Sequence, residues 1–152
     1  MLLFSLVVSA NVAAAATEAS QRKPVYLGTF SQVGYSRGSG DCGGFDAQLW
    51  VMKEPGSQPK VYGFIDSFEG PCDPAEMQIM DGSFDERTGV LKFVAAGVVR
   101  PANLKVRFEG RLSARSLSGR LFYANYKTGQ FGDDAGSSLK LPRVNGLRRP
   151  HW

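Results

Sequence analysis

Residues 42–72 read CGGFDAQLWVMKEPGSQPKVYGFIDSFEGPC and carry the chain's two cysteines, one at each end. Two apolar runs, residues 49–53 and 61–65, flank a loop of turn-forming residues centred on Ser57. If the hairpin pairs symmetrically about Ser57, the numbers of opposite residues add up to 114, as those of Cys42 and Cys72 do. The sequence therefore predicts a β-hairpin whose ends are joined by a Cys42–Cys72 disulfide.

The same alternation of apolar runs and turn residues continues along the chain. Its eighteen glycines and eight prolines separate the apolar runs and are not gathered in one linker, which is typical of an all-β protein. Strands are expected at residues 25–30, 44–53, 60–69, 77–84, 90–99, 103–112, 117–126 and 138–141. Short connections predict an antiparallel up-and-down meander of seven to eight strands, closed or nearly closed into a small β-barrel.

The hairpin of residues 103–126 has the most sharply defined register. Pairing Leu112 with Leu117 places Glu109 opposite Arg120, a favourable cross-strand pair. A slip of one residue would turn the charged side chains into the core. Residues 85–89 are expected to form a type I turn that ends on a left-handed Gly89.

The segment Gly28-Thr29-Phe30 lies at the end of the first expected strand, residues 25–30. It resembles the Gly-x-Trp with which lipocalin-type barrels often open, with Phe in the place of Trp. The resemblance implies a barrel shape, and a fold by itself carries no function.

The first sixteen residues have the features of a signal peptide. Residues 1–8 are almost wholly apolar, and four alanines at 13–16 offer a cleavage site. The apolar stretch is shorter than the roughly 20 residues of a membrane-spanning helix, so no transmembrane span is expected. A disulfide agrees with an exported protein of the periplasm or extracellular space. One domain is expected at residues 17–141, followed by a basic C-terminal tail at 142–152.

The two faces of the 42–72 hairpin differ in composition. One face is aliphatic, while the other is rich in aromatic side chains, and Trp50 is expected opposite Phe64. We treat that second face as a candidate ligand or partner patch, made of Trp50, Met52, Tyr62, Phe64 and Phe68. Three interpretations remain open: a surface covered by loops or the tail, a protein contact, and the lining of a ligand pocket in the barrel lumen.

Charge divides the chain into two halves. Residues 17–86 hold five Lys/Arg and eleven Asp/Glu, so this half is acidic. Residues 87–152 hold thirteen Lys/Arg and three Asp/Glu, so this half is basic. A candidate face for an anionic partner consists of Lys105, Arg107, Arg111 and Arg120. An anionic glycan, a lipid headgroup or an acidic protein would suit it, and a solvated face is the alternative. Nucleic acid is not expected, because aromatic residues are not expected among the basic ones.

The residue inventory argues against catalysis. His151 is the single histidine, and bridged cysteines leave no thiolate nucleophile. No catalytic residue, metal site or cofactor is predicted. The remaining route is a pair drawn from four carboxylates near the bridged end, namely Asp41, Asp46, Glu69 and Asp73.

Together these observations predict an exported, non-catalytic binding or inhibitory module that recognises a protein, a glycan or another anionic partner. The first alternative is a carrier that holds a small apolar ligand in the barrel lumen. The second alternative is a small carboxylate-dependent hydrolase.

Overall fold

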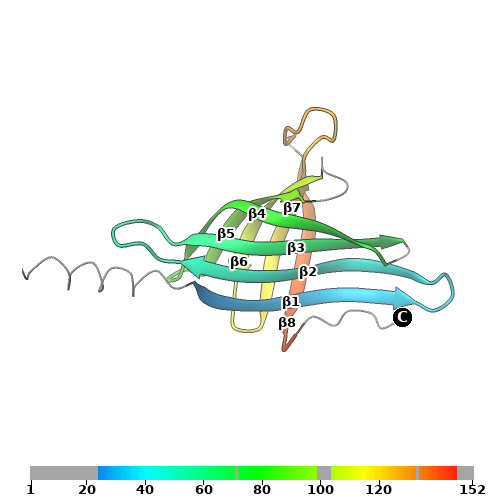
Figure 1. Cartoon of the computed structure of the whole chain (residues 1–152), viewed down its shortest axis with the longest axis horizontal. Coiled ribbons are helices and arrows are strands. Elements are labelled where there is room, and N and C mark those ends of the chain that lie inside the picture. The colour runs from blue at the N-terminus through cyan, green and yellow to red at the C-terminus, as the bar shows by residue number, and fades with distance from the viewer. Residues whose placement is uncertain (1–23, 71, 99–103, 133, 147–152) are drawn as a thin grey trace, which may run out of the picture.

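The structure is a computed structural model that describes residues 24–70, 72–98, 104–132 and 134–146. The expected signal peptide at 1–16 and residues 147–152 of the expected tail, with His151, lie outside the described residues. Eight antiparallel strands follow one another around a closed barrel, which confirms the predicted fold (Figure 1). They are β1 (Val25–Ser36), β2 (Asp41–Met52), β3 (Lys60–Gly70), β4 (Pro74–Asp85), β5 (Val90–Gly97), β6 (Lys105–Leu112), β7 (Ser116–Tyr123) and β8 (Ser137–Val144).

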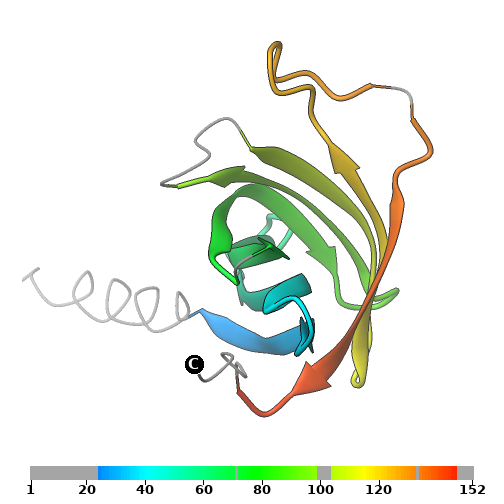
Figure 2. The same ribbon diagram turned by 90° about the vertical axis from the view of Figure 1, so that its right-hand side faces the viewer.

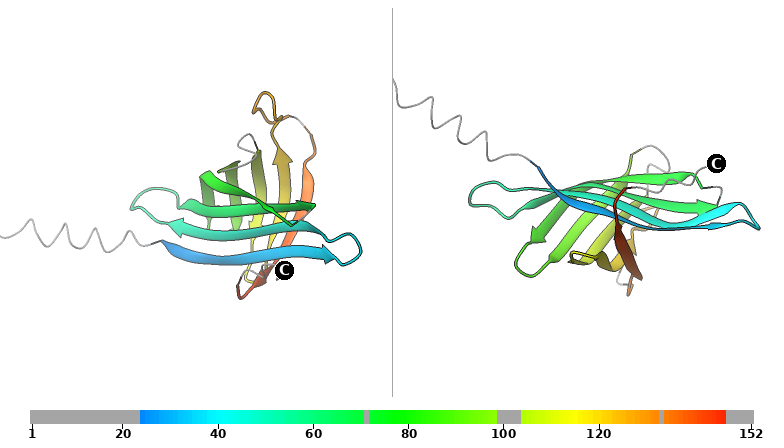
Figure 3. Two further views of the ribbon diagram at one scale, coloured as in Figure 1. Left: turned by 45° about the vertical axis from the view of Figure 1, so that its right-hand side comes forward. Right: turned by 90° about the horizontal axis from the view of Figure 1, so that it is seen from below.

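The barrel is flattened into two walls. Strands β1–β3 lie side by side in the front wall, and β5–β8 form the back wall and run across their direction (Figures 1 and 3). Strand β4 curves from one wall to the other (Figure 2), and we count it with the front wall. The strands of the front wall are 11 or 12 residues long and those of the back wall 8, so the front wall extends beyond the barrel body.

The interior is filled by the inward-facing side chains of all eight strands. Residues alternate between the two faces, so that Leu91, Phe93 and Ala95 of β5 point inward and are almost fully buried. Phe93 stacks on Phe108 with ring centroids 5.0 Å apart. Eighteen buried residues form one continuous core, which is the main source of stability by burial of apolar surface.

Strand β1 is longer than the sequence predicts. A loop was expected from residue 31, but β1 continues to Ser36 and pairs residue for residue with β2, up to Ser36 opposite Asp41. The turn is confined to residues 37–40 and closes with a 2.8 Å hydrogen bond from Gly40 N to Ser36 O. The ladder with β2 overrides the weak strand preference of this Gly- and Ser-rich stretch.

The β2–β3 register differs from the prediction by two residues. Opposite residue numbers add up to 112 rather than 114, so Trp50 lies opposite Tyr62, and Gln48 lies opposite Phe64. The cause is the turn, in which Ser57 N donates to Glu54 O and Gly56 takes φ 76°. Proline followed by a left-handed glycine at the two central positions favours a type II turn, which moves the centre of the hairpin from Ser57 to Gly56. A shift of two leaves every side chain on its predicted face.

The remaining register predictions are confirmed. Strands β6 and β7 pair with Glu109 opposite Arg120 and Gly110 opposite Gly119. Gly89 has φ 72° at the end of the β4–β5 turn. The last strand, β8, pairs with β7 over six residues and closes the barrel on β1 through only two pairs, Thr29–Val144 and Phe30–Arg143.

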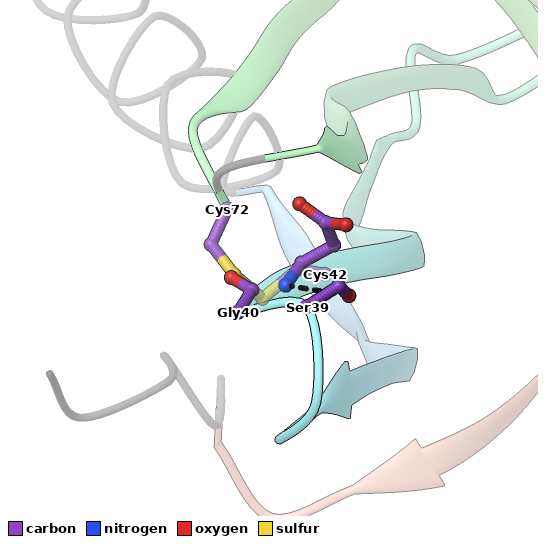
Figure 4. Close-up of a disulfide and its surroundings, with 5 residues drawn as sticks. Ser39, Gly40, Cys42 and Cys72 are labelled. Carbon is purple, nitrogen blue, oxygen red and sulfur yellow. Dashed lines mark hydrogen bonds between the residues drawn. A yellow bond between two sulfur atoms is a disulfide. The ribbon is translucent and has the colours of Figure 1, made fainter.

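The predicted disulfide joins Cys42 to Cys72, although the two residues are not directly opposite in the ladder (Figure 4). Cys42 pairs with Gly70, and the chain then turns back through Cys72, which has φ 66°. Cys72 N donates to Gly70 O at 2.7 Å, and the two cysteine Cα atoms lie 4.7 Å apart. The bridge thus ties the segment before β4 to the start of β2.

Candidate functional site

Four of the five candidate patch residues lie on the outer surface of the front wall. Leu49 and Val51 of β2 are fully buried in the core. Because side chains alternate between the two faces of a strand, Trp50 and Met52 point out of the barrel. Their neighbours on β3 are Tyr62 and Phe64, which are 41% and 38% exposed. The four side chains line an open groove of about 560 Å³, completed by Pro24, Gly63, Gln78 and Ile79.

The groove lies where the ladder between β3 and β4 is irregular. Pairing of the two strands is interrupted between Lys60 and Phe64. Strand β4 bulges between Ile79 and Asp81, and Met80 at the bulge is 69% exposed. A bulge bends its strand and re-aims its side chains, so this irregularity hollows the outer wall beside the aromatic residues.

The position of these side chains bears on the lumen-carrier hypothesis. That hypothesis placed Trp50 and Phe64 inside the barrel, whereas the structure places them on its outer surface. The inward side of the same two strands carries Leu49, Val51 and Ile65, which belong to the packed core.

Phe68, the fifth candidate, is separate from the groove. It is 7% exposed and packs with Cys42, Cys72 and Val33 in a small second cluster at the disulfide end. Phe68 therefore lies apart from the four groove residues with which it was predicted to form a patch, because it is part of the disulfide packing.

The basic candidates come together on the outer surface of the back wall. On β6, Lys105, Arg107 and Arg111 alternate with the fully buried Val106 and Phe108. Arg120 faces the same side from β7. Two further cations on this face, Lys92 on β5 and Lys140 on β8, were missed, although the alternation of their neighbours in the sequence would have identified them. We call these six residues the basic face.

Aromatic rings hold the centre of the basic face. The Arg107 guanidinium lies 4.5 Å from the ring centroid of Phe122 and 5.0 Å from that of Phe131. Lys105 Nζ lies 5.4 Å from the Phe131 ring. Phe131 reaches this surface because the segment after β7 folds back and forms a bridge with Ala124. The expectation that no aromatic residue lies among the cations was therefore wrong.

A single carboxylate, Glu109, lies among the outward-facing residues of β5–β8, all of which are described. Its nearest ion pair is with Arg107 on the same strand, at 3.1 Å. Arg120, which is opposite Glu109 in the ladder, donates instead to the carbonyl of Ala135. The face thus keeps a strong excess of positive charge.

The four carboxylates considered for hydrolysis have different surroundings. Asp41, Glu69 and Asp73 are exposed, whereas Asp46 is 2% exposed and lies directly opposite Asp66. Within the described residues no three His, Cys, Asp or Glu side chains form a group that could hold a metal ion.

Burial raises the pKa of the Tyr123 hydroxyl above its ordinary value, and the negative charge of Glu69 raises it further.

Comparisons with protein families, with curated proteins and with solved structures found no match to this chain. Among the described residues there is no helix with the length and apolar character needed to span a membrane.

Proposed function

We propose that the protein is an exported, non-catalytic binding module that holds an anionic partner on its basic face. The observation that carries this proposal is the gathering of six cations around one carboxylate on the outer surface of four adjacent strands. The Cys42–Cys72 bridge is consistent with export, because disulfides persist in oxidising compartments.

The spacing of the sheet suits a partner with many negative groups. Neighbouring strands lie about 4.8 Å apart, and outward-facing residues about 6.8 Å apart along a strand. Cations on such a grid can meet successive sulfate, phosphate or carboxylate groups of one chain. Several exposed charges of one sign raise the local concentration of an anionic partner and speed its association.

Arg107 is prepared for this role by its neighbours. The rings of Phe122 and Phe131 and the carboxylate of Glu109 fix its guanidinium before any partner arrives. Fixing a long side chain in advance reduces the conformational entropy that binding must otherwise remove. Arginine also offers paired N–H donors that match sulfate and carboxylate groups.

Binding to heparin, a sulfated glycan, tests the proposal. We expect the variant Arg107→Gln/Arg111→Gln/Arg120→Gln to bind at least about tenfold more weakly and with a smaller dependence on salt. The matched control Arg37→Gln/Lys53→Gln/Lys60→Gln removes the same charge from the front wall and should bind as the unmodified protein does. Equal losses in both variants would mean that only net charge matters and would refute a defined site.

Single-stranded DNA serves as a competitor in the same assay, because Phe122 and Phe131 lie among the cations. A glycan partner predicts that heparin displaces DNA at a small fraction of the DNA concentration. The reverse order of affinity would assign the face to nucleic acid.

A second candidate function is supported by the groove on the front wall. Its volume lies within the range of small-ligand sites, and its lining is largely apolar with one amide, Gln78. An apolar ligand or an apolar side chain of a partner protein would fit there. The dye ANS should change the fluorescence of Trp50 on binding, and Phe64→Ala should abolish this change. Met80→Ala, outside the groove lining, is the control, and an unchanged response in Phe64→Ala would reject the groove.

A further inference from the structure

A small pocket opens on the outer surface of the barrel where β4, β5 and β6 lie side by side. Its volume is about 160 Å³. Six of the residues that line it form two rows, and each row crosses the three strands through directly opposite residues. The first row is Asp81, Val94 and Arg107, and the second row is Ser83, Lys92 and Glu109. We call this site the β4–β6 pocket.

A bulge in β4 brings the residues of that strand into the pocket. Before the bulge, Met77 and Ile79 point into the core, and strict alternation would turn Asp81 the same way. The bulge between Ile79 and Asp81 shifts β4 by one residue against β5, so Asp81 lies opposite Val94 on the outer surface. Bulges recur beside binding and active sites, where they re-aim a side chain. Here the bulge places a carboxylate at the edge of the basic face.

The pocket has depth because short side chains stand among long ones. Val94 and Ser83 are half-buried. Opposite residues of neighbouring strands lie about 5 Å apart, so the longer side chains of Lys92 and Arg107 stand beside Val94 as walls. Sites for whole ligands usually measure about 300–1,000 Å³. The smaller β4–β6 pocket therefore suits one unit of a longer chain.

The lining of the pocket is balanced in charge. Lys92 and Arg107 bring two positive charges, and Asp81 and Glu109 bring two negative ones. Arg107 and Glu109 form an ion pair at 3.1 Å, and their side chains remain 33% and 43% exposed. A balanced site attracts a dense polyanion less than the rest of the basic face does. It offers instead N–H donors and carboxylate acceptors within one small volume.

Sugar acids match this combination of groups. Their carboxylate can accept from Lys92 and from the paired donors of Arg107. Their ring hydroxyls can donate to Asp81 and Glu109, which as carboxylates only accept. The acidic side chain of a peptide brings a carboxylate but no hydroxyl. It would cover the two pocket carboxylates without giving them a donor, which costs binding free energy.

We propose that the β4–β6 pocket binds one uronate unit of an acidic polysaccharide, a sugar that carries one carboxylate and several hydroxyls. This inference rests on the function proposed above, in which the basic face attracts an anionic partner. The other cations of the basic face then meet the carboxylates of neighbouring sugar units. The pocket selects a sugar chain over other polyanions.

Two oligomers with six carboxylates each separate the pocket from the charge of the basic face. Hexagalacturonate consists of uronate units, whereas acetylated and amidated hexaglutamate carries the same charge without ring hydroxyls. Calorimetry at low salt should show that the unmodified protein binds hexagalacturonate at least about fivefold more tightly, the effect of one additional net hydrogen bond. Equal affinities, or tighter binding of hexaglutamate, would overturn the proposal.

The variant Val94→Phe fills the pocket without changing any charge. It should bring the affinities for the two hexamers to within about twofold of each other. The control Val90→Phe places the same ring on the same face of β5, outside the pocket lining, and should keep the preference for hexagalacturonate. A preference that remains in Val94→Phe, or that is lost equally in Val90→Phe, would reject the pocket.

For Asp81→Ala, charge and hydroxyl recognition predict opposite results. Removal of a negative charge should tighten the binding of any polyanion. Loss of a hydroxyl acceptor should weaken the binding of hexagalacturonate by about threefold or more, while hexaglutamate binds as before or more tightly. Because Asp81 is exposed, this variant should stay folded even if Val94→Phe does not. Tighter binding of both hexamers would contradict the proposal.

The variant Arg107→Gln/Arg111→Gln/Arg120→Gln distinguishes failure of the pocket from failure of the proposed function. If both hexamers bind the unmodified protein equally and both lose affinity in this variant, the basic face stands and the pocket is rejected. If neither hexamer binds, or if the variant changes neither affinity, the proposed function and the pocket are both rejected.

Discussion

Arg143 closes the barrel at its weakest seam. Its guanidinium lies 4.9 Å from the Phe30 ring, and it donates to Ala114 O at 2.7 Å and Leu27 O at 2.8 Å. These contacts join the last strand both to the first strand and to the β6–β7 turn. The close approach of the Arg143 guanidinium to β1 also explains why position 28 is a glycine, because a Cβ atom there would lie 2.2 Å from Arg143 Nη1.

Arg143→Ala is therefore expected to lower the free energy of unfolding by about 1–3 kcal/mol, since charged hydrogen bonds and a cation–π contact are lost together. Urea denaturation measures this, with the exposed Arg115→Ala as control. Faster hydrogen exchange should be confined to the β1–β8 seam. A loss no larger than that of the control would contradict the closing role of Arg143.

The facing glycines of β6 and β7 make room for a buried ring. A Cβ atom on Gly119 would lie 2.4 Å from Glu109 O and 2.9 Å from Cζ of Phe108. Gly119→Ala should cost about 1–3 kcal/mol of stability, because the backbone of β6 and the ring must both shift. Gly43→Ala, where a Cβ atom meets nothing within 4 Å, should change stability little. Similar urea midpoints for the two variants would mean that position 119 has room for a Cβ atom.

At the scale of single elements, the β4–β5 turn depends on an ionised Asp85. The hydrogen bond from the Thr88 hydroxyl, at 2.7 Å, is the main cause that lowers the pKa of Asp85 below its ordinary 3.8, and the Thr88 and Arg87 amides add to it against some desolvation. The ionised carboxylate therefore stabilises the turn above the ordinary pKa. That contribution is lost as the pH falls through the lowered pKa of the folded state.

Asp85→Ala should accordingly be less stable than the unmodified protein at neutral pH and nearly as stable well below pH 3.8. Urea midpoints across this range measure the difference, and the exposed Asp81→Ala is the control. A difference that stays constant as the pH falls would mean that the carboxylate charge does not support the turn.

The molecule as a whole has a core that is independent of its disulfide. The main core fills the barrel, while Cys42 and Cys72 belong to a separate small cluster at one end. Cys42→Ala/Cys72→Ala should thus remain a folded barrel but lose roughly 3–4 kcal/mol, the usual value for a loop of this length. Circular dichroism checks the fold and urea denaturation the stability. An unfolded double variant would show that the bridge is needed for the barrel itself.

The division of charge along the chain also becomes a property of the whole molecule. Strands β1–β4 come from the acidic half and β5–β8 from the basic half, so each wall inherits one sign. An up-and-down order of strands makes this possible, because it keeps each half of the sequence in one wall. The basic face, proposed above to hold an anionic partner, follows the same division.

Local patterns in the sequence determined the succession of antiparallel strands, the cysteine pair, the Gly89 turn and the β6–β7 register, since each depends on neighbours within one hairpin. The same patterns identified four cations of the basic face. Only the tertiary structure decided the length of β1, the outward position of Trp50 and the approach of Arg143 and Phe131 to distant strands. Those features depend on which strand lies beside which and on how the barrel bends, and no alternation of residues along a single strand encodes that information.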